Sequence, residues 1–105
     1  MPVRLDVEVT ARPSAGVEAV AYFVVSESLT NIAKHARATC AEVSVRTVGG
    51  LLSIRVVDDG VGGAGEKHGS GLRGLRQRVA AVDGVLTLDS PVGRGTSIEV
   101  ELPCE

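Results

Sequence analysis

The chain has 105 residues, which is too short for two domains, and its 44% hydrophobic residues are enough for one core. We therefore treat residues 1–105 as a single domain. Its 11 basic and 13 acidic residues give a formal charge of −2 without a block of like charge, which argues against nucleic acid as a partner. Cys40 and Cys104 lie too far apart for a redox pair or a zinc site, which favours reduced thiols. No run approaches the roughly 20 apolar residues of a membrane span, so we expect no direct membrane contact.

The first two predicted elements are a strand and a long helix. Residues 3–9 alternate apolar and polar side chains, the pattern of a half-buried strand, and the run Arg12-Pro13-Ser14 ends it. From residue 17 to about residue 36, apolar side chains recur at helical spacing. We therefore expect one continuous helix over this stretch.

The remaining elements are two hairpins with a helix between them. Residues 43–46 and 52–56 alternate around Gly49-Gly50, which predicts an antiparallel hairpin. The glycine-rich residues 58–70 predict a loop, and helical spacing over residues 72–82 predicts a second helix. Residues 85–88 and 97–102 alternate around a turn sequence and predict a closing hairpin. This order favours an α/β (α+β) two-layer sandwich, a mixed β-sheet covered on one face by helices, over a doubly wound parallel sheet.

Polar residues of the long helix form the first candidate site. Glu27, Asn31 and Lys34 follow one another at spacings of four and three, so they project from one side of the helix. A solvated polar stripe is the simpler explanation for these three residues taken alone. The residues expected on the opposite, apolar side are Leu29, Ile32, Ala33 and Ala36.

Asn31 is a candidate ligand of Mg²⁺. This ion prefers oxygen ligands and keeps several waters, so one amide oxygen together with phosphate oxygens makes a plausible shell. Lys34 and His35 are a short reach further along the helix and could meet phosphate oxygens. A capping or packing role for His35 is equally common.

A second candidate lies where a predicted strand runs into the glycine-rich loop. A carboxylate at a strand end, here Asp58, can accept a hydrogen bond from an exocyclic amine, and Gly60 and Gly62 would let backbone approach a flat ring. Thr96, after a glycine-rich turn, offers a hydroxyl that could join Asp58 beside the base. Taken singly, an acidic turn and an ordinary strand threonine explain these residues as well.

The third candidate is the glycine run that opens the second helix. Unpaired backbone N–H groups at a helix start favour phosphate, so residues 69–74 are a credible phosphate cradle. The run also matches the dinucleotide fingerprint, with Asp89 at a suitable distance, so an NAD-binding unit is a competing interpretation. A dinucleotide loop should follow its strand at once, whereas here a long loop intervenes.

Together and in order, these blocks carry a family resemblance. The runs 27–36, 58–62 and 69–75 and the pair Gly95-Thr96 resemble the Bergerat-fold ATPases, a superfamily that includes gyrase, Hsp90, histidine kinases and MutL. The resemblance spans roughly residues 17–103. The Asn31-x-x-Lys34-His35 run and the compact loop before Gly69 look most like the NarL and DesK type of sensor histidine kinase.

The resemblance implies one site for Mg²⁺ and ATP. In the family pattern Asn31 ligates Mg²⁺, Lys34 and His35 lie near the phosphates, and Asp58 hydrogen-bonds the adenine amine with Thr96 in support. The loop 63–68 lacks apolar anchors, and we expect it to be poorly ordered without nucleotide. The residues implied to form the base of a lid beside the triphosphate are Gly69, Ser70, Gly71 and Leu72.

The implied catalysis depends on residues outside this chain. Relatives that hydrolyse ATP use the position of Glu27 to activate water, whereas in a kinase we expect it to position or assist an acceptor histidine. Neither His35 nor His68 resembles that acceptor, which the family carries on a preceding dimerisation domain. We therefore expect the C-terminal part of a longer cytoplasmic or membrane-anchored kinase, monomeric and unable to autophosphorylate when isolated. Through the dimerisation domain it would serve a response regulator of the LuxR/NarL type.

Two other functions fit the same residues. A stand-alone anti-sigma-factor serine kinase shares the fold and is similarly small. A regulatory nucleotide-binding module without catalysis would need the same adenine and phosphate contacts but no acceptor.

Overall fold

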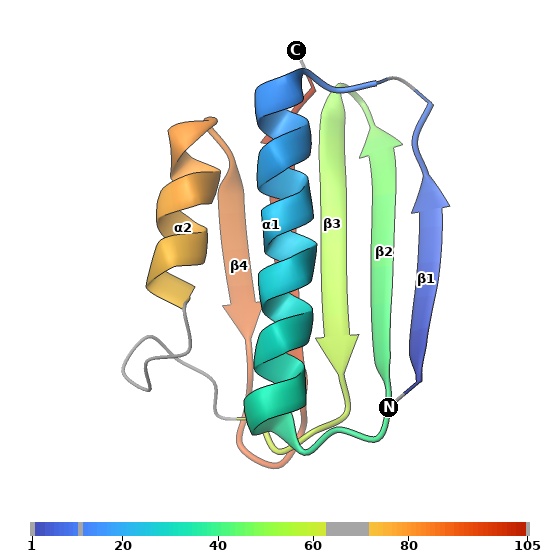
Figure 1. The fold of residues 1–105 in the computed structure, drawn as a ribbon, viewed down its shortest axis with the longest axis vertical. Helices are drawn as coiled ribbons and strands as arrows, with labels where there is room; N and C mark the ends of the chain where they lie inside the picture. Colours follow the sequence, from blue (N-terminus) through green and yellow to red (C-terminus); the bar gives the residue numbers. More distant parts are fainter. Residues whose placement is uncertain (1, 11, 63–71, 105) are drawn as a thin grey trace.

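The computed structural model describes residues 2–10, 12–62 and 72–104, in which five strands form one mixed sheet with two α-helices on one face (Figure 1). The strand order is β1-β2-β3-β5-β4, with β1 parallel to β2 and the other neighbours antiparallel. The predicted two-layer sandwich is confirmed. In chain order the elements are β1 (Val3–Glu8), α1 (Ala15–Asn31), a π-helical turn η1 (Ile32–Ala36), β2 (Ala41–Val48), β3 (Leu51–Asp58), α2 (Leu72–Ala81), β4 (Val85–Asp89) and β5 (Thr96–Pro103).

Both predicted hairpins are present. β2 and β3 pair around Gly49 and Gly50, whose φ values of 55° and 82° favour glycine. β4 pairs with β5, and β5 also pairs with β3, so the last strand lies inside the sheet. Because β3 and β5 are antiparallel, the end of β3 lies beside the start of β5.

The core lies between the sheet and the helices. Alternation in β3 and β5 and helical spacing in α2 place one apolar face of each of these elements inward, as the sequence predicts. The guanidinium carbon of Arg78 on α2 lies 4.0 Å from the ring centroid of Phe23 on α1, which joins the two helices. The buried apolar residues are Val17, Val24, Ile32, Ala41, Val43, Leu52, Ile54, Val56, Leu72, Leu75, Val79, Leu86, Ile98, Val100 and Leu102.

The prediction of a half-buried first strand is wrong. β1 forms, but all six of its residues are exposed, including Leu5 at 64% and Val7 at 55%. Their Cα partners Val43 and Val45 place them on the helix side of the sheet. β1 is an edge strand, and α1 runs along the middle of the sheet, between β4 and β3 in the view of Figure 1, so it does not cover β1.

The first helix also ends differently from the prediction. α1 begins behind Ser14, whose hydroxyl accepts from the N–H of Val17 at 3.3 Å, and it ends at Asn31. The π-helical turn η1 then shifts the side-chain directions, so Ala33, predicted on the apolar side, is exposed, whereas Ile32 is buried. Within the described ranges no helix is both long and apolar enough to cross a membrane.

Candidate functional site

The strand ends bring two predicted site residues together. Asp58 closes β3 and Thr96 opens β5, and they are Cα partners in the ladder. Asp58 continues the inward alternation of Ile54 and Val56, and Thr96 continues that of Ile98, so both side chains lie on the helix side of the sheet. The structure therefore brings these two residues together, and their contact with a base stays a prediction.

Asp58 is a buried carboxylate. It is 5% exposed, and its Oδ1 accepts a hydrogen bond from the N–H of Gly60 at 2.7 Å. A carboxylate buried among apolar side chains costs free energy unless polar groups surround it. The side chain is thus fixed in direction and retains acceptor capacity for a ligand, because each carboxylate oxygen has two lone pairs.

Thr96 is supported by a residue that the sequence analysis missed. Its Oγ1 lies 2.6 Å from Oγ of Ser90, and either hydroxyl can be the donor. Ser90 comes from the β4–β5 turn and also lies 3.5 Å from the carbonyl oxygen of Gly95. The pairing of β4 with β5, which the sequence predicts, brings these hydroxyls together, but the sequence does not indicate that the two side chains meet.

Two glycines allow the loops at this end to touch. Gly95 has φ 78°, and a Cβ there would lie 2.2 Å from the carbonyl oxygen of Asp58. A Cβ on Gly62 would lie 2.0 Å from the carbonyl oxygen of Pro91. The space that Gly62 leaves is therefore filled by the β4–β5 turn, which gives it a packing role that the sequence did not indicate. Its predicted contact with a base remains a prediction.

The last turns of α1 carry two unsatisfied polar atoms. Within the described residues, Oγ of Ser28 and Nδ2 of Asn31 are the buried side-chain nitrogen and oxygen atoms without a hydrogen-bond partner. Ser28 is 1% exposed and was not singled out in the sequence. Buried polar groups in proteins are nearly always hydrogen-bonded, so a pair of exceptions is a mark of a functional site.

These atoms lie at the level of Asp58. α1 and β3 start at the same end of the molecule and run side by side in the same direction (Figure 1). At about 1.5 Å per helical residue and about 3.3 Å per strand residue, Ser28 is about 20 Å and Asp58 about 23 Å from that end. The polar end of α1 therefore lies at the same end of the molecule as the end of β3 and the start of β5 (Figure 1).

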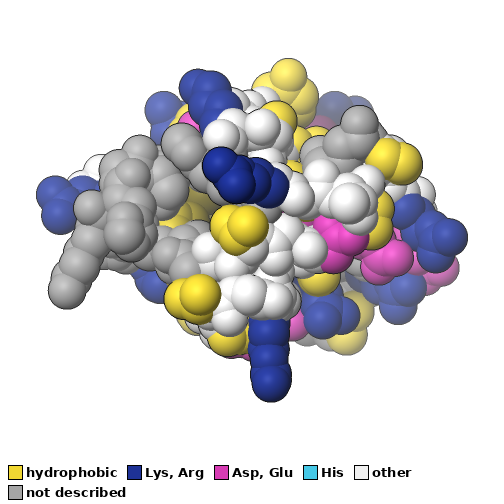
Figure 2. Space-filling view, turned by 90° about the horizontal axis from the view of Figure 1, so that it is seen from below, with side chains coloured by type: hydrophobic (Ala, Val, Ile, Leu, Met, Phe, Trp, Pro, Cys, Tyr) yellow, Lys and Arg dark blue, Asp and Glu magenta, His cyan; other side chains and the backbone are white. Residues whose placement is uncertain are grey.

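Of the other predicted residues on the first helix, Glu27 is half-buried on α1 and Lys34 is exposed on η1. His35 belongs to η1, but its side chain lies outside the description. Figure 2 looks onto this end of the molecule, where Lys and Arg side chains project singly and Asp and Glu side chains gather between them.

The predicted phosphate cradle is described only at its end. Gly69, Ser70 and Gly71 lie outside the described residues, as does the predicted lid loop 63–68. Leu72 is the first residue of α2 and its side chain is buried in the core. Any contact of Leu72 with phosphate would therefore come from its backbone N–H at the helix start.

Asp59, next to Asp58, faces the opposite way and holds the loop after η1. Its Oδ1 accepts from the N–H groups of Thr39 at 2.8 Å and Cys40 at 3.1 Å, and its Oδ2 accepts from the Thr39 hydroxyl. The hydroxyl of Thr39, followed by the two N–H groups, holds the pKa of Asp59 well below its usual range. The Cys40 thiol beside this carboxylate has a raised pKa.

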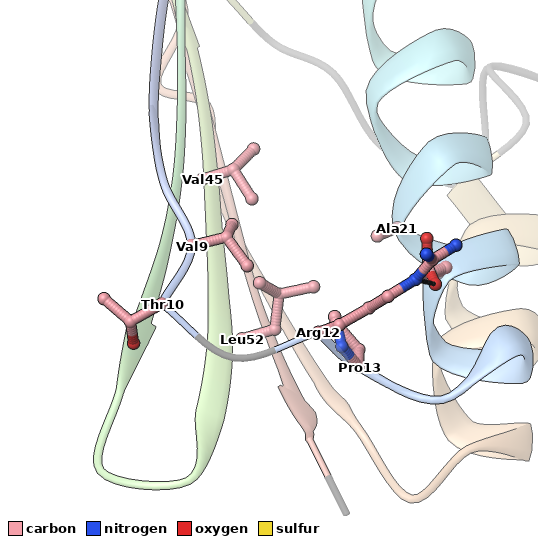
Figure 3. Close-up of a pocket in the computed structure, with 8 residues that line it drawn as sticks. Val9, Thr10, Arg12, Pro13, Ala21, Val45 and Leu52 are labelled. Carbon is pink, nitrogen blue, oxygen red and sulfur yellow. Dashed lines mark hydrogen bonds and ion pairs between the residues drawn. The ribbon is translucent and has the colours of Figure 1, made fainter.

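Cavity size does not identify the site. A cavity of about 280 Å³ lies beside Asp58 and Thr96. A larger one, of about 350 Å³, lies at the other end of the sheet, where Val9, Val45 and Leu52 line it between β1 and α1 (Figure 3). Its charged residues, Arg12 and Glu18, already form an ion pair at 2.9 Å. The smaller cavity contains Asp58 and Thr96 but no residue of α1, so it covers only the strand-end part of the candidate site.

Known proteins are similar to this chain in sequence and in fold. The family model described as "Histidine kinase-, DNA gyrase B-, and HSP90-like ATPase" matches residues 16–105. The oxygen sensor histidine kinase NreB of Staphylococcus carnosus is 37% identical over 91 residues, which are 83% of this chain and 26% of NreB. The sensor histidine kinase LiaS of Bacillus subtilis is 31% identical over 104 residues, which are 96% of this chain and 29% of LiaS.

A solved structure supports the same relationship. The blue-light activated histidine kinase EL346 of Erythrobacter litoralis superposes with a TM-score of 0.77 at 25% identity, over 97% of this chain and 35% of that one. The chain thus spans less than a third of the length of the curated relatives above. The predicted resemblance is confirmed: the chain belongs to the histidine kinase-, DNA gyrase B- and HSP90-like ATPases, with the ATPase-domain fold of sensor histidine kinases.

Proposed function

We propose that this chain binds Mg·ATP between α1 and the ends of β3 and β5, and that the full-length protein uses it to phosphorylate its own histidine. The observation that carries the proposal is that the buried carboxylate of Asp58 lies at the same end of the molecule as the two unsatisfied polar atoms of Ser28 and Asn31 (Figure 1). A polar ligand at this place would satisfy all three groups at once.

Base binding is assigned to the strand ends. Asp58 would accept a hydrogen bond from the adenine amine, and its direction is already fixed by the N–H of Gly60. Thr96 would support the base through its hydroxyl, held by Ser90. A rigid acceptor and a held hydroxyl lower the ordering cost of binding, which favours a flat ligand with a matching edge.

The residues of α1 and η1 fit Mg²⁺ and phosphate. Within the described residues no group of three His, Cys, Asp or Glu side chains could hold a metal ion, so a bound Mg²⁺ would rely on Asn31 and on phosphate oxygens. Mg²⁺ would take the amide oxygen Oδ1 of Asn31, and the buried, unpaired Nδ2 could donate to a phosphate oxygen. Exposed Lys34 is free to reach phosphate oxygens, and His35 is assigned beside it.

Backbone N–H groups of Gly69, Ser70, Gly71 and Leu72 are assigned to the phosphates, because they precede or open α2. Bound Mg²⁺ would neutralise phosphate charge, which is the main requirement of phosphoryl transfer. Half-buried Glu27 is assigned to position the acceptor histidine. The acceptor, the dimerisation domain and the LuxR/NarL-type response regulator belong to the full-length kinase, which we expect in the cytoplasm or anchored at its membrane.

Titration calorimetry with ATP, ADP and NAD, with and without Mg²⁺, tests the proposal. ATP and ADP should bind and NAD should not. Asp58→Asn should weaken the affinity for ATP at least about tenfold, because one hydrogen bond to a charged group is lost. Asp83→Asn, in the exposed turn after α2, is the matched control, because asparagine also accepts its φ of 61°.

The variant Asn31→Ala separates the contribution of the metal to ATP binding from that of the base. It should abolish the Mg²⁺ dependence of ATP binding while adenosine binding persists. Equal ATP affinity of the parent chain and Asp58→Asn would remove the base assignment. Preferential NAD binding would favour the dinucleotide alternative instead.

A further inference from the structure

The strongest unassigned feature is the tie between the end of β3 and the loop after η1. Asp59 is the first residue beyond β3, and Thr39 and Cys40 come directly before β2. Its carboxylate accepts two backbone N–H bonds, at 2.8 and 3.1 Å, and the hydroxyl of Thr39. The thiol of Cys40 adds a contact of 3.5 Å to the same carboxylate.

The tie anchors a short and irregular part of the chain. η1 (Ile32–Ala36) is a π-helical turn, and Arg37 leaves it in the left-handed region with φ 51°. π-Helical turns are rare and occur frequently at functional sites. The position of η1 is thus set by α1 on one side and by the Asp59 tie on the other.

The two neighbouring aspartates face opposite ways. Strand alternation turns Asp58 toward the helices, where the base is assigned. Asp59, just beyond the strand, is exposed and bonds to the loop before β2. Asp59 holds the segment that follows Lys34. The dipeptide Asp58-Asp59 therefore connects the part of the site assigned to the base with the part assigned to the phosphates.

We propose that Asp59 is a positioning residue that fixes η1, with Lys34, relative to the base-binding carboxylate of Asp58. This inference rests on the proposed function of the site. Asp59 touches no nucleotide in this scheme. It sets the spacing between the groups that hold the base and those that hold the phosphates, so it acts on triphosphate binding and leaves base binding alone.

The test compares ATP with adenosine, both measured by calorimetry with Mg²⁺. Asp59→Ala removes the whole tie, and Thr39→Val removes only the hydroxyl bond. Both should weaken ATP, Asp59→Ala by about tenfold and Thr39→Val by less, while adenosine affinity stays within about twofold. Asp59→Asn keeps one acceptor oxygen for the two backbone N–H groups and should restore most of the ATP affinity.

Thr47→Val is the matched control. Thr47 also makes a surface tie, accepting from the N–H of Thr10 at 2.9 Å and pairing with its hydroxyl at 2.8 Å, at the opposite end of β2. It should change neither ligand's affinity. If Asp59→Ala fails to fold, the ATP to adenosine ratio of Thr39→Val and Asp59→Asn decides the question.

Two results would overturn the inference. An unchanged ratio of ATP to adenosine affinity in Asp59→Ala and Thr39→Val would show that the tie does not position the phosphate side. Equal loss of both ligands would show a general structural role. A parent chain that bound neither ATP nor adenosine would instead refute the proposed function.

Discussion

The hydroxyl of Thr96 lies 2.6 Å from the hydroxyl of Ser90, at the place where β5 begins beside the buried carboxylate of Asp58. Each hydroxyl holds the other in one direction, so the edge offered to a base is fixed before binding. Loss of either hydroxyl removes this hydrogen bond, whose net contribution to stability is about 0.5–1.5 kcal/mol.

Thr96→Val therefore tests the base contact. Valine keeps the shape of threonine, so the strand should form, but the free energy of unfolding should fall by about 1 kcal/mol and ATP affinity by roughly fivefold to tenfold. Thr87→Val, an exposed threonine on β4, is the control and should change neither quantity. Chemical denaturation and calorimetry measure the two effects. Unchanged ATP affinity in Thr96→Val would remove this residue from the site.

Ser28→Ala should raise stability while it weakens ligand binding. The Ser28 hydroxyl is buried without a partner, and removing such a group relieves a desolvation cost of about 1–3 kcal/mol. The melting temperature of the nucleotide-free protein should therefore rise. ATP affinity should fall, because we assign this hydroxyl to the ligand side.

Ser26→Ala, on the exposed side of α1, is the control for helix propensity. A lower melting temperature for Ser28→Ala than for Ser26→Ala would show that the hydroxyl serves the fold rather than a ligand.

The sequence predicted the sheet and both hairpins, because strand alternation and turn residues are local signals. The pairing of β3 with β5, which makes Asp58 and Thr96 neighbours, was not predicted. It did not predict the exposure of β1, since Leu5 alternates like any half-buried residue and only the position of α1 decides whether it is covered. The π-helical turn after Asn31 was also missed, because the apolar spacing continues through it.

The supporting side chains of the site were equally hidden. Thr39 and Asp59 are 20 residues apart, and only strand pairing brings them together. Ser90 and Thr96 flank one turn, and the turn sequence does not show that their hydroxyls meet. The unpaired hydroxyl of Ser28 was also not predicted. A helical pattern predicts which residues are buried, but it does not predict which of their atoms lack a hydrogen-bond partner.

Two glycines of one turn separate backbone strain from close contact. Gly93 and Gly95 have similar φ values, 81° and 78°, but a Cβ on Gly93 meets nothing within 4 Å, whereas one on Gly95 lies 2.2 Å from the carbonyl oxygen of Asp58. Gly93→Ala should lower the free energy of unfolding by about 1–2 kcal/mol, because alanine is strained in the left-handed region.

Gly95→Ala should cost at least about 2 kcal/mol more, because the backbone of Asp58 must shift. It should also weaken ATP binding, whereas Gly93→Ala should not. Denaturation and calorimetry on the pair give both numbers. Similar stability of the two variants would mean that the β3–β5 contact yields without cost.

The Asp59 tie should make stability depend on acid pH in a defined direction. The folded pKa of Asp59 is depressed below its ordinary value of 3.8, chiefly by the hydroxyl of Thr39. The carboxylate thus binds its proton more weakly in the folded state, and the tie contributes its full stability above pH 3.8. As the pH falls from 3.8 toward the folded pKa, that contribution is lost.

The measurement is the difference in unfolding free energy between the parent and Asp59→Asn, taken from neutral pH downward. Asparagine does not titrate, so the parent should be the more stable protein at neutral pH and the gap should narrow steadily below pH 3.8. Thr39→Val should reduce the pH dependence, because the hydroxyl is the largest cause of the depressed pKa. A gap that stayed constant with pH would show that Asp59 titrates alike in the folded and unfolded chains.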